Sequence, residues 1–331
     1  MIRTSHHLDA KPSSFHHLRS IVLRGGRLVK FKGVAASLGP MLGSEASLLG
    51  STASALAIGV VLGGGMLGAA PALAGTCSAP VGGVSVCTGG ADSATDTTQT
   101  IRGDVGALVS VTTDSGFGID TTQASGNALT IIGRGSLSFT DDNASGITGT
   151  VRGIYARNEG TGALSVTTTG AVTAIEKVGI FARQNGAGAL IITATGAVTG
   201  GLLIDDAGVG VSAQNGIYAN NRGSDLTISA VDVTSGQSGI NGRNLGTGAL
   251  TITSTGTATS LRSSGILATN DRASANTHLT VIAVDTNGGR YGIQALNQGT
   301  GVGALTAIIH EAPVLARGAM FEGPLLLDAH R

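Results

Sequence analysis

Two pairs of adjacent aspartates, Asp141 and Asp142 and then Asp205 and Asp206, are the strongest candidates for catalysis in this sequence. Paired carboxylates can perform acid–base hydrolysis of glycans or bind calcium. Each pair falls in one of two lengthened steps of a repeat, where such folds place functional groups. However, no histidine–aspartate–serine combination accompanies them, and loops are ordinarily polar. We therefore expect no enzyme, no metal and no cofactor, with a polysaccharide hydrolase or lyase as the alternative.

A short motif, Arg102, Gly103 and Asp104, matches a tripeptide that some surface proteins use to contact host integrins. A turn beside the first repeat explains three such residues equally well. Charged residues make up 12% of the chain, about half the usual share. Since nucleic-acid binding needs clustered Lys and Arg, this composition argues against a nucleic-acid partner.

Cys77 and Cys87 are the only cysteines, and Gly82 and Gly83 lie between them. In an exported protein, such a close pair favours a small hairpin closed by a disulfide, which contributes roughly 2–3 kcal/mol. A lipid-modified Cys77 is the weaker alternative, because Thr76 is a poor residue to precede a lipidated cysteine.

These candidates are set in a repeat that covers most of the chain. Gly-Ile pairs recur from Gly118-Ile119 to Gly292-Ile293, at steps of 35, 26, 37, 23, 26 and 27 residues. Five residues after each of these glycines stands a carboxamide: Gln123, Asn158, Gln184, Asn221, Asn244, Asn270 and Asn297. A leucine follows each pair: Leu129, Leu164, Leu190, Leu226, Leu250, Leu279 and Leu305. The segment from Gly106 to Gly116 is interpreted as a damaged eighth copy.

The repeat predicts β-structure rather than helix. Thr, Val and Ile fill its apolar runs, which alternate with a period of two residues, and no proline stands between Pro80 and Pro313. About 25 residues suffice for a coil of three short strands. We therefore expect an all-β, right-handed parallel β-helix with seven to eight rungs, an amide ladder at one corner, and glycines at the tight turns. Tyr155, Phe181 and Tyr218 then predict an aromatic stack or, alternatively, a platform for sugars.

The N-terminal part has the features of an export signal. A basic region precedes the apolar stretch "ALAIGVVLGGGMLGAAPALAG", and small residues precede a favoured cleavage point between Ala74 and Gly75. A transmembrane anchor is the alternative, although the glycines weaken its hydrophobicity. We expect a leader at residues 1–74, a cap containing the cysteines at 75–100, the β-helix at 101–309 and an irregular tail at 310–331.

The Gly-Ile-x-Ala-x-Asn and Gly-Thr-Gly-Ala-Leu motifs, together with the long basic leader, resemble the β-helical passenger regions of bacterial autotransporters. The resemblance implies Sec-dependent export, display at the outer membrane, and adhesion or aggregation. It departs from that family in lacking a C-terminal translocator barrel. The chain is therefore either a truncated or frameshifted fragment, which we favour, or it completes export by another route.

The expected function is that of a non-enzymatic surface stalk. Its expected partners are a host or neighbouring-cell surface, the extracellular matrix, or a second copy of itself. The expected location is the cell surface, outer membrane or medium, or the periplasm if no translocator is supplied.

Overall fold

The computed structural model describes residues 74–204, 210–271, 278–300, 303–309, 319–322 and 325–328; for 203–204, 210–213, 319 and 325–328 it describes the backbone only. The chain divides into two units, Met1–Gly63 and Gly64–Arg331, and every described residue belongs to the second. The predicted leader lies outside the described residues, apart from Ala74.

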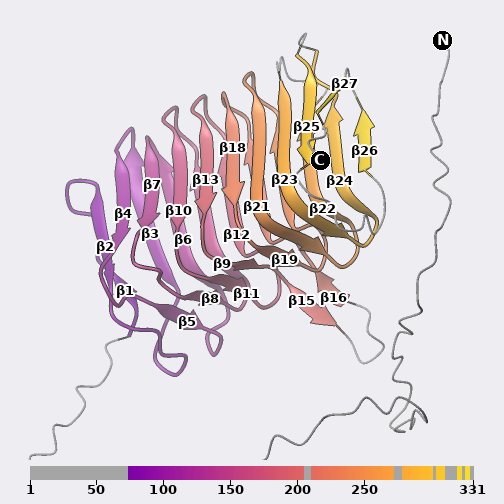
Figure 1. The fold of residues 1–331 in the computed structure, drawn as a ribbon. Coiled ribbons are helices and arrows are strands. Elements are labelled where there is room, and N and C mark those ends of the chain that lie inside the picture. Colours follow the sequence, from indigo (N-terminus) through magenta and orange to yellow (C-terminus); the bar gives the residue numbers. More distant parts are fainter. Residues whose placement is uncertain are drawn as a thin grey trace, which may run out of the picture. The chain divides into compact units, whose positions relative to one another are not determined.

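The described part is all-β and forms a parallel β-solenoid of about eight turns (Figure 1). Each regular coil contributes one strand to a nine-stranded sheet, which we name the Ile sheet, and two strands to a sixteen-stranded sheet. The two strand rows of the larger sheet are named the Leu strip and the Val strip after the residues that begin them. The all-β, parallel β-helical prediction is therefore confirmed.

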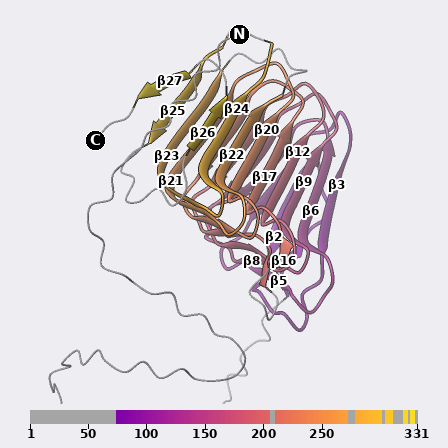
Figure 2. The same cartoon turned by 90° about the vertical axis from the view of Figure 1, so that its right-hand side faces the viewer.

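The Ile sheet is seen in strand order in Figure 2. Its strands are β3 (Gln99–Val105), β6 (Asn127–Arg134), β9 (Arg152–Asn158), β12 (Ile180–Gln184), β17 (Ile217–Asn221), β20 (Ile240–Asn244), β22 (Ser264–Asn270), β24 (Tyr291–Asn297) and β26 (Ala319–Glu322).

The larger sheet combines the other two strand rows. The Leu strip contains β4 (Val109–Thr113), β7 (Leu137–Asp141), β10 (Leu164–Thr168), β13 (Leu190–Ala194), β18 (Leu226–Ala230), β21 (Leu250–Ser260), β23 (Leu279–Gly288), β25 (Leu305–Ile309) and β27 (Leu325–Asp328). The Val strip contains β5 (Ile119–Thr121), β8 (Ile147–Gly149), β11 (Val172–Ala174), β14 (Val198–Thr199) and β19 (Val233–Ser235), and the C-terminal halves of β21 and β23 continue it.

Aligned aliphatic side chains form the core. Leu164, Leu190 and Leu226 occupy consecutive positions of one column and are fully buried. In the Ile sheet, Ile154 and Ile180 form a second buried column by the same register. Because strands in register lie about 4.8 Å apart, each buried side chain is covered by its counterparts on adjacent rungs. Such burial contributes roughly 1.5–3 kcal/mol per side chain, but only while the neighbouring rungs are present.

The first Gly-Ile pair of the predicted repeat is assigned to the wrong strand row. Ile119 pairs with Ile147 in the Val strip. The residue in register with Ile154 is instead Leu129, so Leu129 belongs to the Ile sheet rather than to the leucine column. The error arises because Gly-Ile begins strands in both rows: Gly146-Ile147 has the same sequence.

The leucine column is completed by a residue that the repeat pattern overlooked. Leu137 is in register with Leu164, and Val109 is in register with Leu137. The segment predicted to be a damaged copy therefore forms a true rung through β4. The step from Leu129 to Ile154 is 154 − 129 = 25 residues, so it carries no insertion.

The other lengthened step does contain an insertion. Between β14 and β17 an antiparallel hairpin, β15 (Leu202–Ile204) and β16 (Gly210–Ala213), leaves the coil (Figure 1). Asp205 and Asp206 fall between these strands and lie outside the described residues.

Both ends of the solenoid differ from the predicted boundaries. At the N-terminal end, β1 (Thr76–Cys77) pairs antiparallel with β2 (Val84–Thr88), and a disulfide joins Cys77 to Cys87. Strand β2 also pairs in parallel with β4, which makes the cap part of the sheet. At the C-terminal end, β26 and β27 pair in parallel with β24 and β25 and extend the solenoid into the segment expected to be irregular.

The repeated turns require glycine because the rungs approach each other closely. A Cβ atom on Gly186 would lie 1.8 Å from the carbonyl oxygen of Gly160, and one on Gly246 would lie 1.8 Å from that of Gly223. These glycines do not have a left-handed backbone; within the described ranges, positive φ at glycine occurs from Gly82 to Gly126. Tight stacking, rather than turn conformation, therefore explains the Gly-Thr-Gly motif.

Candidate functional site

The outer surface of the Ile sheet carries an ordered row of large side chains. Tyr155, Phe181 and Tyr218 are in register on β9, β12 and β17. Their ring centroids are 5.1 and 5.2 Å apart, with interplanar angles of 15° and 18°. The three rings are half-buried, because in a strand that buries alternate residues the intervening side chains point outward. The structure thus contains the predicted aromatic stack.

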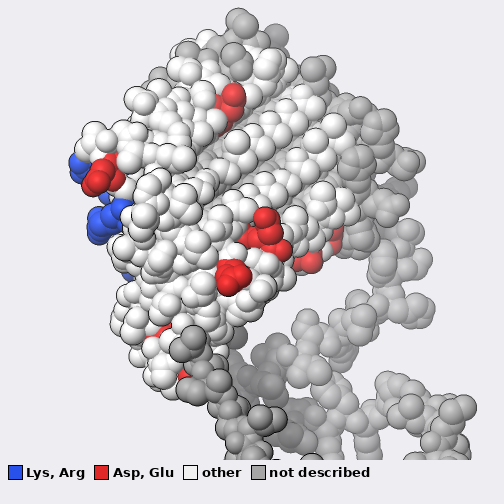
Figure 3. Space-filling view, turned by 90° about the vertical axis from the view of Figure 1, so that its left-hand side faces the viewer, with Lys and Arg blue, Asp and Glu red and all other residues white. Residues whose placement is uncertain are grey.

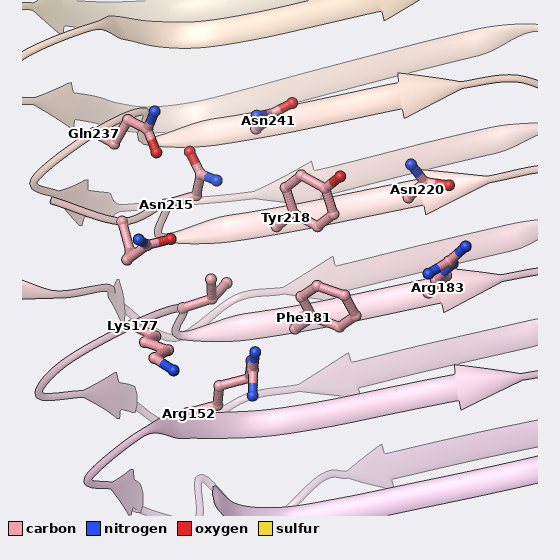
Figure 4. A pocket seen from close by; sticks show the side chains of 11 residues that line it. Arg152, Lys177, Phe181, Arg183, Asn215, Tyr218, Asn220, Gln237 and Asn241 are labelled. Atoms are coloured by element: carbon pink, nitrogen blue, oxygen red, sulfur yellow. The ribbon is translucent and has the colours of Figure 1, made fainter. Parts of the chain in front are cut away.

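A groove of about 470 Å³ lies beside this stack and reaches from Arg152 on β9 to Asn241 on β20 (Figure 4). Figure 4 shows the rings of Phe181 and Tyr218 with their faces turned toward the viewer, between amide and cationic side chains. We call this feature the aromatic–amide groove.

Three cationic side chains line the groove. The Arg152 guanidinium lies 5.3 Å from the centroid of the Tyr155 ring and 5.2 Å from that of Phe181, within the range of cation–π attraction. Burial lowers the pKa of Arg152, and the charge interaction with Tyr155 acts in the opposite direction. Arg183 donates from Nε to the Asn185 side-chain oxygen at 2.8 Å, and Lys177 is exposed.

These three cations form no ion pair with a carboxylate of the described residues. In contrast, three neighbouring arginines do form such pairs. Arg134 and Arg157 both contact Glu159, at 3.4 and 2.6 Å, and Arg243 pairs with Asp271. The groove therefore concentrates positive charge. On the side of the molecule shown in Figure 3, Lys and Arg gather only at one edge of a largely uncharged surface.

Two asparagines in the groove have unsatisfied carbonyl groups. Asn215 and Asn220 are only 6% and 9% exposed, and neither side-chain oxygen accepts a hydrogen bond. Figure 4 places both side chains beside the Tyr218 ring. Buried acceptors of this kind normally have a partner, so each is a position at which a ligand donor would be stabilised. Gln214, Gln237 and Asn241 add further amides to the lining.

The predicted amide ladder lies on the opposite side of the same strands, inside the coil. Asn158, Gln184, Asn221, Asn244, Asn270 and Asn297 are in consecutive register and form one column. Asn221 donates from Nδ2 to Asn244 Oδ1 at 3.0 Å, and Asn270 donates to Asn297 Oδ1 at 3.1 Å.

The asparagines of the column also bind the turn that follows their own strand, whereas Gln184 donates to the Gly162 carbonyl of the preceding rung. Asn158, for example, donates to the Gly162 carbonyl at 2.7 Å and accepts from the Gly160 amide at 3.1 Å. Gln123 does not join the column: it is exposed in the turn after β5, and Gly133 occupies the position in register with Asn158. This correction follows from the misassigned first Gly-Ile pair.

Asp141 is the buried last residue of strand β7 rather than a loop acid. Its carboxylate accepts hydrogen bonds from the hydroxyls of Thr113 at 2.9 Å and Ser145 at 2.7 Å, and from the Gly170 amide at 3.2 Å. Asp142 is exposed. Burial raises the pKa of Asp141, but the hydrogen bonds from Ser145, Thr113 and the backbone outweigh it and lower the pKa overall.

The Arg102–Asp104 tripeptide lies at the end of β3, an edge strand of the Ile sheet. Arg102 and Asp104 are exposed, and the Ala107 amide donates to the Asp104 carbonyl at 3.2 Å. A depression of about 370 Å³ includes all three residues, together with Arg134, Arg157 and Glu159. Contact with an integrin stays a prediction.

The predicted cleavage site precedes Gly75. Gly75 is buried, and its backbone amide donates a hydrogen bond to the Asp96 carboxylate at 2.8 Å. Cleavage between Ala74 and Gly75 stays a prediction.

Sequence reasoning missed the polar residues of the groove. Arg152 and Asn215 each stand immediately before a Gly-Ile pair, and Arg183 and Asn220 each stand two residues after an aromatic. Comparing the variable positions across repeat copies, rather than only the constant ones, would have brought these residues together.

Within the described ranges, no group of three or more His, Cys, Asp or Glu residues could hold a metal ion. Among the same residues, no helix has the length and apolar character needed to cross a membrane. No family model, no curated protein and no solved structure matched the chain.

Proposed function

We propose that this protein is an exported solenoid stalk of the passenger type, which acts at a cell surface in adhesion or self-association. The observation that carries the proposal is the aromatic–amide groove on the outer face of a regular sheet. Partly exposed aromatic rings beside cations that form no ion pair with a described carboxylate are typical of binding surfaces rather than of a solvated face. The parallel register holds these side chains on a rigid element, as recognition requires.

In this proposal, the leader directs export through its basic region, its apolar stretch and the small residues before Gly75. The Sec machinery recognises the leader, and the body reaches the cell surface or the medium; without a translocator it stays in the periplasm. The resemblance of the repeat motifs to autotransporter passengers supports this route. The surface partner is a host or neighbouring cell, matrix material, or another copy of the chain.

Adhesion is tested by producing the chain in a bacterium that lacks it. We expect the producing cells to settle together faster, or to bind epithelial monolayers or matrix-coated wells more strongly, than cells carrying an empty vector. The matched control is the same chain without residues 1–74, which remains in the cytoplasm. Fractionation shows whether the full chain leaves the cytoplasm. The N-terminal sequence of the exported protein is expected to begin at Gly75.

The proposal fails if the exported chain reaches the surface and none of these three attachments increases. It also fails if the cytoplasmic control increases attachment equally, because the effect then does not come from surface display.

A further inference from the structure

We propose that the aromatic–amide groove binds a carboxylate-bearing sugar of an acidic glycan. This inference rests on the proposed function, since the glycan would be the material that the stalk contacts. The groove volume of about 470 Å³ lies in the ordinary range for small-ligand sites, roughly 300–1,000 Å³.

The charge of the groove selects an anionic ligand. Arg152, Lys177 and Arg183 line the groove and have no carboxylate partner among the described residues. An arginine can bind a carboxylate through two parallel N–H donors, and a lysine adds a flexible third contact. An anion bound in the groove is therefore attracted by these cations.

The unsatisfied amides select a ligand that also carries hydrogen-bond donors. Asn215 Oδ1 and Asn220 Oδ1 are acceptors without a partner, and both side chains are more than nine-tenths buried. Figure 4 places Asn220 near Arg183 and Asn215 near Tyr218, so both lie beside the positive and aromatic parts of the groove. A carboxylate alone offers no donor, whereas sugar hydroxyl groups supply donors to both oxygens.

The aromatic rings provide the apolar part of the recognition. Phe181 and Tyr218 lie in the groove lining with a face of each ring turned toward the viewer in Figure 4. A pyranose ring has C–H groups on its faces, which pack on an aromatic face by dispersion and burial. Carboxylate, hydroxyl groups and an apolar ring face are united in uronic and sialic acids.

A nucleic acid would also supply an anion and flat rings, but it fits the site less well. Its affinity depends on a run of cations along successive phosphates. The Ile sheet instead has paired arginines on either side of the groove, Arg157 on β9 and Arg243 on β20. Binding of a single-stranded oligonucleotide more tightly than an acidic oligosaccharide would overturn the proposal.

The test measures binding of defined probes to the purified chain by titration calorimetry. The probes are a hexamer of galacturonic acid, its methyl ester, a sialylated trisaccharide, and a neutral glucose hexamer. We expect at least one acidic probe to bind and the binding of the galacturonate hexamer, if it is the ligand, to fall at least tenfold on esterification. No binding by either acidic probe overturns the inference, as does equal binding of the neutral hexamer.

Matched variants locate the binding to the groove. Arg183→Gln and Lys177→Gln remove cations, and Phe181→Ala removes a ring; each is expected to weaken binding roughly tenfold to a hundredfold. The controls lie outside the groove lining, Arg290 in the bend immediately before β24 and Leu267 on β22. Arg290→Gln alters another arginine–tyrosine contact, 5.2 Å from the Tyr291 ring, and Leu267→Ala alters the position that continues the aromatic row.

Both controls are expected to bind as the original chain does, and thermal unfolding verifies that each variant is folded. If all five variants lose affinity equally, or none does, the groove is not the site. Should attachment to cells persist while no acidic probe binds, only the ligand assignment fails. Should the probes bind while surface display promotes no attachment, the proposed adhesive function fails and the glycan site stands.

Discussion

At the scale of single residues, polar groups inside the solenoid connect successive rungs. Asp141 illustrates this most clearly, because Thr113 comes from the preceding rung and Gly170 from the following one. A buried carboxylate with several donors is stabilised as the anion, since hydrogen bonds to the charged form offset its desolvation. Asp141, which first suggested acid–base catalysis, therefore has a structural role, because its carboxylate connects three successive rungs.

Replacing Asp141 by Asn is expected to destabilise the fold by about 1–3 kcal/mol at neutral pH, because an amide N–H₂ group then faces backbone and hydroxyl donors. The folded-state pKa of Asp141 is depressed. Its contribution is therefore fully present above the unfolded pKa of about 3.9 and is lost as pH falls through the lower folded value. Denaturant unfolding of both proteins between neutral and acid pH measures this difference.

The exposed neighbour provides the control for that experiment. Asp142→Asn is expected to change the free energy of unfolding by less than about 0.5 kcal/mol. If the Asp141 variant retained full stability at neutral pH, the proposed structural role of its hydrogen bonds would be wrong.

At the scale of elements, strands of the Ile sheet that end in a column asparagine, such as β9 and β20, are followed by a turn held from two directions. The column amide binds the turn from inside, as Asn244 does by accepting from the Gly246 amide at 3.2 Å and donating to the Gly248 carbonyl at 2.9 Å. From the adjacent rung, a carbonyl occupies the space where a side chain would begin. The two constraints act together to align successive turns.

Gly186→Ala is expected to destabilise the protein by roughly 1–3 kcal/mol, because its Cβ atom would lie 1.8 Å from a backbone oxygen of the neighbouring rung. Gly146→Ala is the matched control, since it is exposed and no atom lies within 4 Å of its added Cβ. We expect that control to be neutral or slightly stabilised. Thermal melts of the two variants measure the difference. An equal loss of stability in both would contradict the explanation that Gly186 is required by the close approach of the neighbouring rung.

At the scale of the whole molecule, the rungs form one cooperative array. No single coil buries its aliphatic residues without a neighbour, so stability depends on the number of coils and on their common register. The aromatic–amide groove is itself a product of that stacking, because its lining comes from successive rungs.

Deletion of residues 240–265 removes 266 − 240 = 26 residues, the spacing between register-equivalent isoleucines on β20 and β22. We expect this protein to fold, with a β-type circular dichroism spectrum and a lower melting temperature. Deleting residues 240–252 instead removes half a coil and should prevent cooperative folding, since the remaining strands lose their register. Equal behaviour of the two deletions, or a mainly helical spectrum of the parent chain, would contradict the solenoid.

The sequence by itself determined the β-class, the length of the coil and most of the amide column, because stacked strands require like residues at a constant spacing. The tertiary structure alone decided that Ile119 begins a Val-strip strand, that Leu137 belongs to the leucine column, and that Gln123 lies outside the amide column. A sequence records spacing along one chain, whereas register depends on which side chains share a buried column. The aromatic–amide groove was hidden for the same reason: Arg152, Phe181 and Tyr218 line one groove only when their three rungs are stacked.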